Sequence, residues 1–392
     1  MISHRTVFSP DGSHLAHYSR SSGTLTIHKL NKSQPLATRC AELTCLNFHA
    51  NEFTLAAISH GQDNKLVIFN FKNKLYQQYI SLNLEFKSQI RSHQPQLVSY
   101  SNNGLMAIYT KVSIDSKIEN LLLVVDINLD FSIIHQKILT TEILDFVWND
   151  KGDVILTCGQ NGTMGIYSKD LELLQLLNLS TSALSSIIYD EEVILIGTRE
   201  GSVLILDPLS LACKSVIDVE GSVSKIGLGE YFGFKVVVVN FSNDWKRPSL
   251  LIPLNLSECS NIKEKLKDQL LTKFGNKHGD LGRKLVDDLI EGIKDSIMEW
   301  QFLGNSDGVM ITKGSNGHIA HINKDERVAL RSVNDTTFDY FKYKLEVKLP
   351  QKKEEPNRQE SLKRERERDR ERERDRERER ERDHRERKYR RR

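Results

Sequence analysis

A short apolar strand followed by a tight polar turn recurs along the first 340 residues, and this repeat constrains the fold more than any other feature. In each copy an apolar or aromatic residue precedes the turn. These residues are Phe8, Phe48, Tyr100, Trp148, Ile188, Leu228 and Leu303, at intervals of 40, 52, 48, 40, 40 and 75 residues. A period of about 40 residues is the length of one four-stranded propeller blade. The sequence therefore predicts a repeat architecture of seven units.

The clearest copy spans residues 146–167. Apolar strands alternate there with turns at 150–152 and 160–162. Gly and Asn tolerate the positive φ angles that tight turns require, so the segment predicts an antiparallel meander. We expect Trp148 to fill the space between adjacent blades, and Gly152 and Gly162 to let the strands reverse.

The predicted strands are continuous apolar runs, for example at 121–125, 203–206 and 236–239. Such runs favour strands that are buried on both faces, as in sheets stacked around a channel. A sandwich of unrelated hairpins is the alternative, but it does not require the pattern to return every 40 residues. We therefore expect an all-β fold, a seven-bladed β-propeller over residues 1–345. An extended hairpin at 111–120 accounts for one of the longer intervals.

The pattern resembles the WD40-repeat β-propeller family over roughly residues 5–340. The resemblance rests on the turn at 9–12, on Trp148 with the glycine-containing turns that follow it, and on the segment 197–202. Third strands end in Val125-Asp126 and Leu206-Asp207, where the family has Trp-Asp. No unit has a true Trp-Asp, and the others end in Phe69-Asn70, Tyr167-Ser168 and Ile322-Asn323. The family's Gly-His opening and buried polar network are not recognisable, so the resemblance implies the architecture alone.

The period fails at residues 255–298, where the apolar spacing becomes helical. The two apolar stripes are Ile262, Leu266, Leu270, Leu271 and Phe274, and then Leu281, Leu285, Val286, Leu289, Ile290, Ile293 and Ile297. We expect an αα-hairpin inserted between blades six and seven, with Asn261 and Glu264 as a capping pair and Asp280 as the second N-cap. Gly275-Asn276 is expected to end the first helix.

This insertion admits two interpretations. Its stripes pack on each other and on the propeller wall, or one stripe docks a partner protein. Residues 263–298 carry eight basic and seven acidic side chains. The near-equal charge argues against a nucleic-acid or membrane surface.

Residues 346–362 form a polar linker, and residues 363–392 a low-complexity tail with 15 Arg and 2 Lys against 11 acidic residues. The tail has no apolar face, so it cannot join a core. Like charges lie four residues apart, which disfavours a helix, and opposite charges lie three apart, which favours one. We expect a disordered or fluctuating-helical segment. It could pair with other mixed-charge tails, including as a coiled coil, or be passive. Its basic end at 388–392 could direct nuclear import or contact phosphates.

Five scattered cysteines without Cys-x-x-Cys spacing argue against a disulfide framework or a structural zinc site and fit a reducing compartment. The N-terminus lacks the profile of a signal peptide, and no apolar run approaches the ~20 residues that span a bilayer. We expect a soluble intracellular protein located in the nucleus, with the cytoplasm as the alternative and no membrane partner.

The sequence contains no nucleotide-binding loop, nucleophile elbow or zinc-protease motif. His318 and His321 lie three apart on a predicted strand, which points them to opposite faces, and His14 and His17 have the same spacing. We expect no catalytic, cofactor-binding or metal-binding residue, and hence no enzyme, although a site assembled from distant loops at the channel mouth stays possible.

The expected function is that of a non-catalytic scaffold that binds protein subunits through its rims and the 255–298 hairpin. Arg-Glu and Arg-Asp tails resemble those of nuclear RNA-associated proteins, so an RNA-processing or ribosome-assembly complex is the expected setting. Two alternatives stay open. The tail binds RNA directly, or the chain is a cytoplasmic propeller subunit of a trafficking or cytoskeletal assembly.

Overall fold

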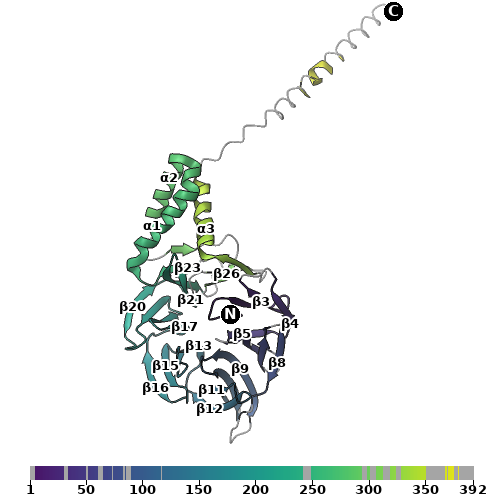
Figure 1. The fold of residues 1–392 in the computed structure, drawn as a ribbon, viewed down its shortest axis with the longest axis vertical. Coiled ribbons are helices and arrows are strands. Elements are labelled where there is room, and N and C mark those ends of the chain that lie inside the picture. The colour runs from purple at the N-terminus through teal and green to yellow at the C-terminus, as the bar shows by residue number, and fades with distance from the viewer. Residues whose placement is uncertain are drawn as a thin grey trace, which may run out of the picture. The chain divides into compact units, whose positions relative to one another are not determined.

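A computed structural model shows a ring of antiparallel sheets, a β-propeller, with a helical insertion on one side (Figure 1). The structure describes residues 5–30, 34–49, 52–60, 65–72, 74–82, 84, 90–115, 117–241, 249–293, 298–300, 306–311, 318–323, 328–349, 367–368, 370–374 and 378. Within these residues no helix is long and apolar enough to cross a bilayer.

Six sheets have four strands each, and we number them as blades 1 to 6 in chain order. Blade 1 consists of β1 (Thr6–Phe8), β2 (His14–Ser19), β3 (Thr24–Lys29) and β4 (Leu36–Arg39). Blade 2 consists of β5 (Leu43–Phe48), β6 (Thr54–Ser59), β7 (Lys65–Asn70) and β8 (Tyr76–Ile80). Blade 3 consists of β9 (Ile90–Tyr100), β10 (Leu105–Ile114), β11 (Lys117–Asp126) and β12 (Ser132–Leu139).

Blade 4 consists of β13 (Ile143–Trp148), β14 (Val154–Gly159), β15 (Thr163–Ser168) and β16 (Leu173–Asn178). Blade 5 consists of β17 (Leu184–Asp190), β18 (Val193–Thr198), β19 (Ser202–Leu206) and β20 (Cys213–Asp218). Blade 6 consists of β21 (Val223–Tyr231), β22 (Phe234–Phe241), β23 (Ser249–Pro253) and β24 (Met298–Trp300). Every strand pairs antiparallel with the next one in its blade.

The prediction of seven blades was wrong, because the structure contains six four-stranded blades. The seventh repeat corresponds to a three-stranded sheet of β25 (Ser306–Ile311), β26 (His318–Asn323) and β27 (Val328–Ser332). This sheet contacts β21 and β22 on one side and β1 on the other. After β27 the chain enters helix α3 (Val333–Lys348) instead of a fourth strand. Leu303, the last of the predicted repeat markers, lies outside the described residues.

The continuous apolar runs are buried on both faces, as predicted. All six residues of β18 are buried, and one hydrophobic cluster extends through blades 2, 3 and 4. Trp148 is 5% exposed, and its indole nitrogen donates to the Ser99 carbonyl of blade 3 at 3.1 Å. It therefore fills the space between blades, as expected. Gly152 and Gly162 have φ angles of 66° and 81°, which confirms their predicted role in the turns. The extended hairpin is also confirmed, since β10 and β11 pair continuously from Leu105 with Asp126 to Ile114 with Lys117.

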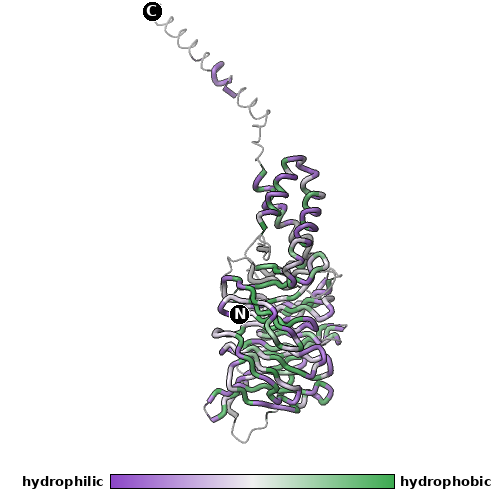
Figure 2. Tube along the Cα trace, turned by 90° about the vertical axis from the view of Figure 1, so that its left-hand side faces the viewer, coloured by the Kyte–Doolittle hydropathy of each residue, from purple (hydrophilic) through white to green (hydrophobic). Residues whose placement is uncertain are grey.

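The helical insertion joins β23 to β24, so it lies inside blade 6 and not between two blades. It comprises a 3-10 turn η1 (Leu256–Glu258), helix α1 (Cys259–Leu270), a π-helical turn η2 (Leu271–Gly275) and helix α2 (Asn276–Glu291). Figure 2 shows it as a hairpin that projects beyond the ring, with hydrophilic and hydrophobic positions alternating along it.

The predicted ends of these helices were partly wrong. The first helix begins at Cys259 with no side-chain cap, so Asn261 and Glu264 lie inside it and do not cap it. Gly275 has helical angles, and the chain reverses at Gly279, where φ is 60° and ψ is −144°. Most of the predicted first stripe is buried, namely Ile262, Leu266, Leu270 and Phe274. In the second stripe Leu281 is exposed, and Ile297 lies outside the described residues.

The chain divides into two compact units, Met1–Tyr343 and Lys344–Arg392. The boundary between these units falls inside α3. The predicted linker at 346–362 begins in the last residues of this helix, and its residues 350–362 lie outside the described part. The described residues of the tail, between Glu367 and Arg378, are helical and exposed.

Candidate functional site

The first strand of each blade lies innermost, and together these strands surround a cavity of about 160 Å³ on the propeller axis. Four of these strands share an irregularity. A β-bulge interrupts pairing with the second strand just before the third residue of the inner strand, and the residues after the bulge are Cys45, Asp145, Ser186 and Lys225. A bulge re-aims the side chain that follows it. Here the side chains after the bulge reach the neighbouring blades.

The contacts made by these residues tie the inner strands together. Asp145 accepts hydrogen bonds from the Ile187 amide of blade 5 at 3.1 Å and from Lys225 Nζ of blade 6 at 2.8 Å. Ser186 Oγ accepts a hydrogen bond from the Ile226 amide at 3.4 Å, and the Cys45 thiol donates to the Val98 carbonyl at 3.9 Å. The charged side chains at the axis, Asp145 and Lys225, thus pair with each other and link blades 4, 5 and 6. Their role is structural.

The buried thiols of Cys45, at the axis, and of Cys158, in β14, are poor nucleophiles. Burial raises the pKa of Cys45 to about 11, although its hydrogen bond to Val98 acts in the opposite sense. Burial also raises the pKa of Cys158. A thiol that stays protonated at neutral pH is unreactive. Among the described residues no group of three or more His, Cys, Asp or Glu side chains is arranged to hold a metal ion.

The histidines singled out in the sequence are not brought together. His17 Nδ1 is 2.8 Å from Thr6 Oγ1 in blade 1, whereas the His14 ring packs against Phe71 at 5.4 Å. The backbones of His318 and His321 pair with Ser332 and Ala329 across β26 and β27, and their side chains lie outside the described part of the structure.

One face of the ring carries the turns between first and second strands and the loops between third and fourth strands, and we call it the loop face. The Lys169 amide of one such loop donates to the Asp153 carbonyl of the neighbouring turn. Because the helical insertion joins the third strand of blade 6 to its fourth, it belongs to the same face.

A polar residue at the end of the third strand, or up to two residues after it, caps these loops in five blades. Its side chain accepts a hydrogen bond from a backbone amide two to four residues ahead, and the capping residues are Asn70, Asp126, Ser168, Asp207 and Asn255. Asp126 and Asp207 stand where the resemblance predicts the Asp of Trp-Asp. Asn, Asp and Ser all form such local turns, which explains why the position keeps its role without keeping one residue type.

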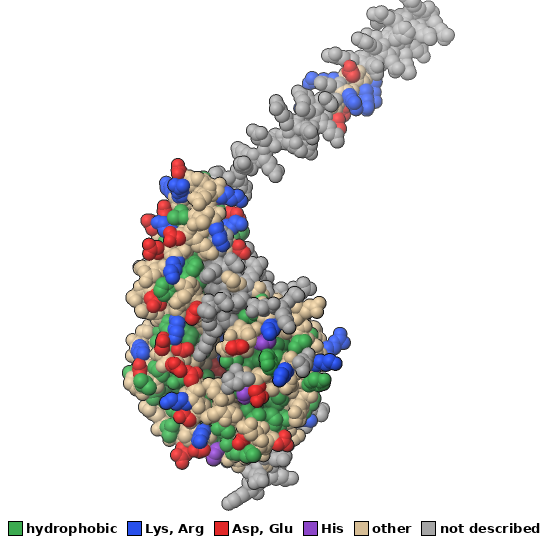
Figure 3. Space-filling view, viewed as in Figure 1, with side chains coloured by type: hydrophobic (Ala, Val, Ile, Leu, Met, Phe, Trp, Pro, Cys, Tyr) green, Lys and Arg blue, Asp and Glu red, His purple; other side chains and the backbone are tan. Residues whose placement is uncertain are grey.

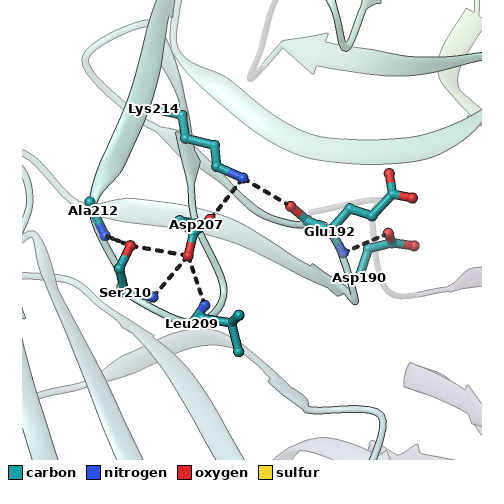
Figure 4. Close-up of polar contacts among 7 residues, drawn as sticks. All are labelled: Asp190, Glu192, Asp207, Leu209, Ser210, Ala212 and Lys214. Atoms are coloured by element: carbon teal, nitrogen blue, oxygen red, sulfur yellow. Dashed lines mark hydrogen bonds and ion pairs between the residues drawn. The ribbon is translucent and has the colours of Figure 1, made fainter.

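Asp207 gives the most completely fixed of these loops (Figure 4). One carboxylate oxygen accepts the amides of Ser210 at 2.8 Å and Leu209 at 3.0 Å, and the other pairs with Lys214 Nζ at 2.9 Å. The hydrogen bonds from Ser210 and the pairing with Lys214 lower the pKa of this carboxyl. Leu209, in the same loop between Asp207 and Ser210, is 95% exposed. The loop therefore holds an apolar side chain in water with a fixed backbone.

Neighbouring turns surround this loop with paired charge. Lys235 of blade 6 reaches Asp190 at 3.1 Å and Glu192 at 2.9 Å in blade 5. Burial lowers the pKa of Lys235, but its hydrogen bonds to both carboxylates outweigh burial and raise it. Burial and the nearby carboxylates raise the pKa of Tyr189. Figure 3 shows acidic and basic side chains interspersed over the visible face of the ring.

The helical insertion is fixed to blade 6 at its base. Ile262 of α1 is fully buried in a cluster with Tyr231, Val236 and Leu251. Lys265 donates to the Phe232 carbonyl at 2.9 Å and lies 4.4 Å from the centre of the Phe234 ring. These contacts confirm that the first stripe packs on the propeller wall at Ile262.

Sequence reasoning missed the residues after the bulges and the caps of the loops. The caps had a signal in five blades, a polar residue at or just after the third strand, which was interpreted only as a degenerate Trp-Asp. The residues after the bulges had no sequence signal, because Cys, Asp, Ser and Lys share no chemical type. No protein-family model matches this chain, and the comparison with curated proteins found no match.

Proposed function

We propose that this protein is a non-catalytic scaffold that binds other proteins through the loop face of its propeller and the helical insertion of blade 6. One observation carries the proposal. The insertion is anchored in the blade through Ile262 and Lys265, and it projects beyond the ring as a helical hairpin. A rigid projection needs less ordering when it binds a partner, and so loses less affinity.

The loop face supports the same proposal. Leu209 is almost fully exposed on a loop whose backbone is fixed by Asp207. An apolar side chain held in place in this way suits a partner's pocket, since contact residues that are already ordered bind best. The axial charges, by contrast, are engaged between blades and offer no reacting group.

The finer setting of this proposal is a nuclear RNA-processing or ribosome-assembly complex. The mixed-charge tail and the basic end at 388–392 support it. Direct RNA binding by the tail is the second candidate, and it predicts an affinity that falls steeply with salt.

The test is affinity purification of the intact protein beside two variants. In one, residues 255–297 are replaced by a short Gly-containing turn that joins β23 to β24, and in the other residues 363–392 are deleted. Stoichiometric protein partners that are lost with the insertion support the scaffold. Recovery of RNA alone, lost with the tail, contradicts it. Fluorescent tagging of the same proteins tests the nuclear setting, which cytoplasmic signal from the intact chain would contradict.

A further inference from the structure

The fold separates charge along the helical insertion in a way that the total composition hides. We define its tip as residues 273–284 and its base as residues 258–272 with 285–293. The tip carries Lys273, Lys277, Arg283 and Lys284 against the single acid Asp280. The base carries three lysines against six acids, Glu258, Glu264, Asp268, Asp287, Asp288 and Glu291. The net charge is therefore +3 at the tip and −3 at the base.

The lysines of the base are used within the molecule. Lys265 contacts blade 6, Lys263 donates to the Ile293 carbonyl, and Lys267 pairs with Asp287 at 2.7 Å. The basic residues of the tip are all exposed. No ion pair or hydrogen bond joins the side chains of Lys277, Arg283 or Lys284 to another described residue.

The tip is nevertheless well packed. Phe274 is 2% exposed, and the His278 ring stacks on it at 4.5 Å. Gly275 and Gly282 bring the two helices close together, since a Cβ at Gly282 would lie 3.3 Å from the Gly275 Cα. The basic side chains thus project from a fixed backbone. Leu281 lies among them and is 46% exposed.

We propose that this tip binds an acidic segment of a partner protein that also presents an apolar side chain to Leu281. Positive charge without an internal partner attracts carboxylates and steers their approach. Leu281 favours a peptide over a nucleic acid, because a leucine offers nothing to a phosphate. Single-stranded RNA is usually held by exposed aromatic rings, and the only aromatic rings of the tip are the buried Phe274 and the half-buried His278 stacked on it. This inference rests on the proposed scaffold function and names the chemistry of one partner.

The test is binding of three labelled probes to the full-length protein, followed by fluorescence anisotropy at about 150 mM salt. The first probe is a 12-residue peptide of Glu and Asp with three leucines, the second has serine in place of leucine, and the third is a 12-nucleotide poly-uridine RNA. We expect the leucine peptide to bind most tightly and the RNA most weakly.

Two variants and one control assign the binding to the tip. Lys277→Glu with Arg283→Glu and Lys284→Glu should weaken binding of the leucine peptide at least tenfold. Leu281→Ser should remove most of the preference for leucine over serine. The matched control reverses three exposed lysines of blade 2, Lys65, Lys72 and Lys74, and should bind like the unaltered protein.

Four results would overturn the proposal: no binding of the leucine peptide, tighter binding of RNA, equal losses in the tip and control variants, or concentration-dependent self-association that the tip variant abolishes. The last result would make a second copy the occupant. Failure here is distinct from failure of the scaffold. If the tip variant retains the protein partners that replacement of 255–297 removes, only the tip inference falls.

Discussion

The propeller axis and the tip of the insertion both carry lysines, but the lysine at the axis is partly buried and paired, whereas those at the tip are exposed. Lys225 has a side chain that is 20% exposed and ends against Asp145, which is itself 9% exposed. Lys277 and Lys284 at the tip are exposed and have no described partner. Charge that is withdrawn from water must be paired, whereas exposed charge stays available. The comparison separates groups that hold the fold from groups that can bind.

The same contrast holds for the glycines. Gly162 is enclosed, and a methyl group there would overlap the Ser180 carbonyl oxygen. Gly279 at the reversal of the hairpin has no atom within 4 Å of a would-be Cβ. Both have positive φ angles. The backbone requirement is therefore shared by these two glycines, while only Gly162 also has a steric requirement.

The largest expected effect comes from Asp145→Ala. It leaves Lys225 without its partner and removes the acceptor of the Ile187 amide. Breaking a buried ion pair from one side costs about 3–5 kcal/mol, so we expect the free energy of unfolding to fall by that amount. Chemical denaturation of the purified protein measures it.

A double variant tests whether the unpaired charge of Lys225 causes this loss of stability. Asp145→Leu with Lys225→Met removes both charges, and we expect it to be more stable than Asp145→Ala. It should not regain the full stability, because the Ile187 amide still lacks its acceptor. If Asp145→Ala unfolds like the unaltered protein, the axial pair does not hold the blades.

The glycine comparison gives the next effect. Gly162→Ala should lower the free energy of unfolding by about 3 kcal/mol or more, because backbone strain and overlap with Ser180 add. Gly279→Ala should cost about 1–2 kcal/mol from strain alone. Denaturation monitored by near-UV and far-UV circular dichroism measures both. Equal losses in the two variants would show that the enclosure of Gly162 has no energetic consequence.

The fold was largely predictable because hairpin turns and apolar strands are local features. Trp148, Gly152 and Gly162 lie within one meander, and their roles follow from that meander. The count of blades was not predictable in the same way. After β27 the chain could continue as a strand or a helix, and the apolar spacing of Phe341 and Leu345 is helical. Counting repeats at a fixed period therefore predicted a seventh four-stranded blade, although the local pattern changes to a helix after β27.

The candidate site was less predictable, because it depends on which positions the fold brings together. The near-equal numbers of basic and acidic residues over 263–298 argued against a nucleic-acid or membrane surface, but a sum over the sequence ignores position along the hairpin. The reversal at Gly279 decides which residues form the tip, whereas the sequence pattern predicted that the first helix ends at Gly275. Both glycines are good helix ends in isolation, and packing of Gly275 against Gly282 selects the later one.

The Asp207 loop is intermediate in character between the propeller axis and the tip. Its carboxylate is near the surface, as at the tip, but it is held by hydrogen bonds, as at the axis. Asp207→Ala should speed hydrogen exchange of the Leu209 and Ser210 amides on the order of tenfold without changing the global unfolding transition. The pKa of Asp207 is lowered in the folded state, so its contribution is complete above the ordinary value of 3.8. The contribution is lost as pH falls below that value. Exchange rates at several pH values test this, and protection that persists in the variant would contradict it.

The smallest effect is expected at the tip, and there the comparison becomes sharpest. Reversing Lys277, Arg283 and Lys284 changes the net charge of the molecule by −6, yet it removes no ion pair with a described residue. Substitutions on such surfaces usually change the free energy of unfolding by less than about 0.5 kcal/mol each. We therefore expect the triple variant to unfold close to the unaltered protein, whereas the single change at Asp145 destabilises it strongly. Chemical denaturation of both variants in the same buffer makes the measurement. A loss from the tip variant as large as that from Asp145→Ala would mean that these charges support the fold and are not held free for a partner.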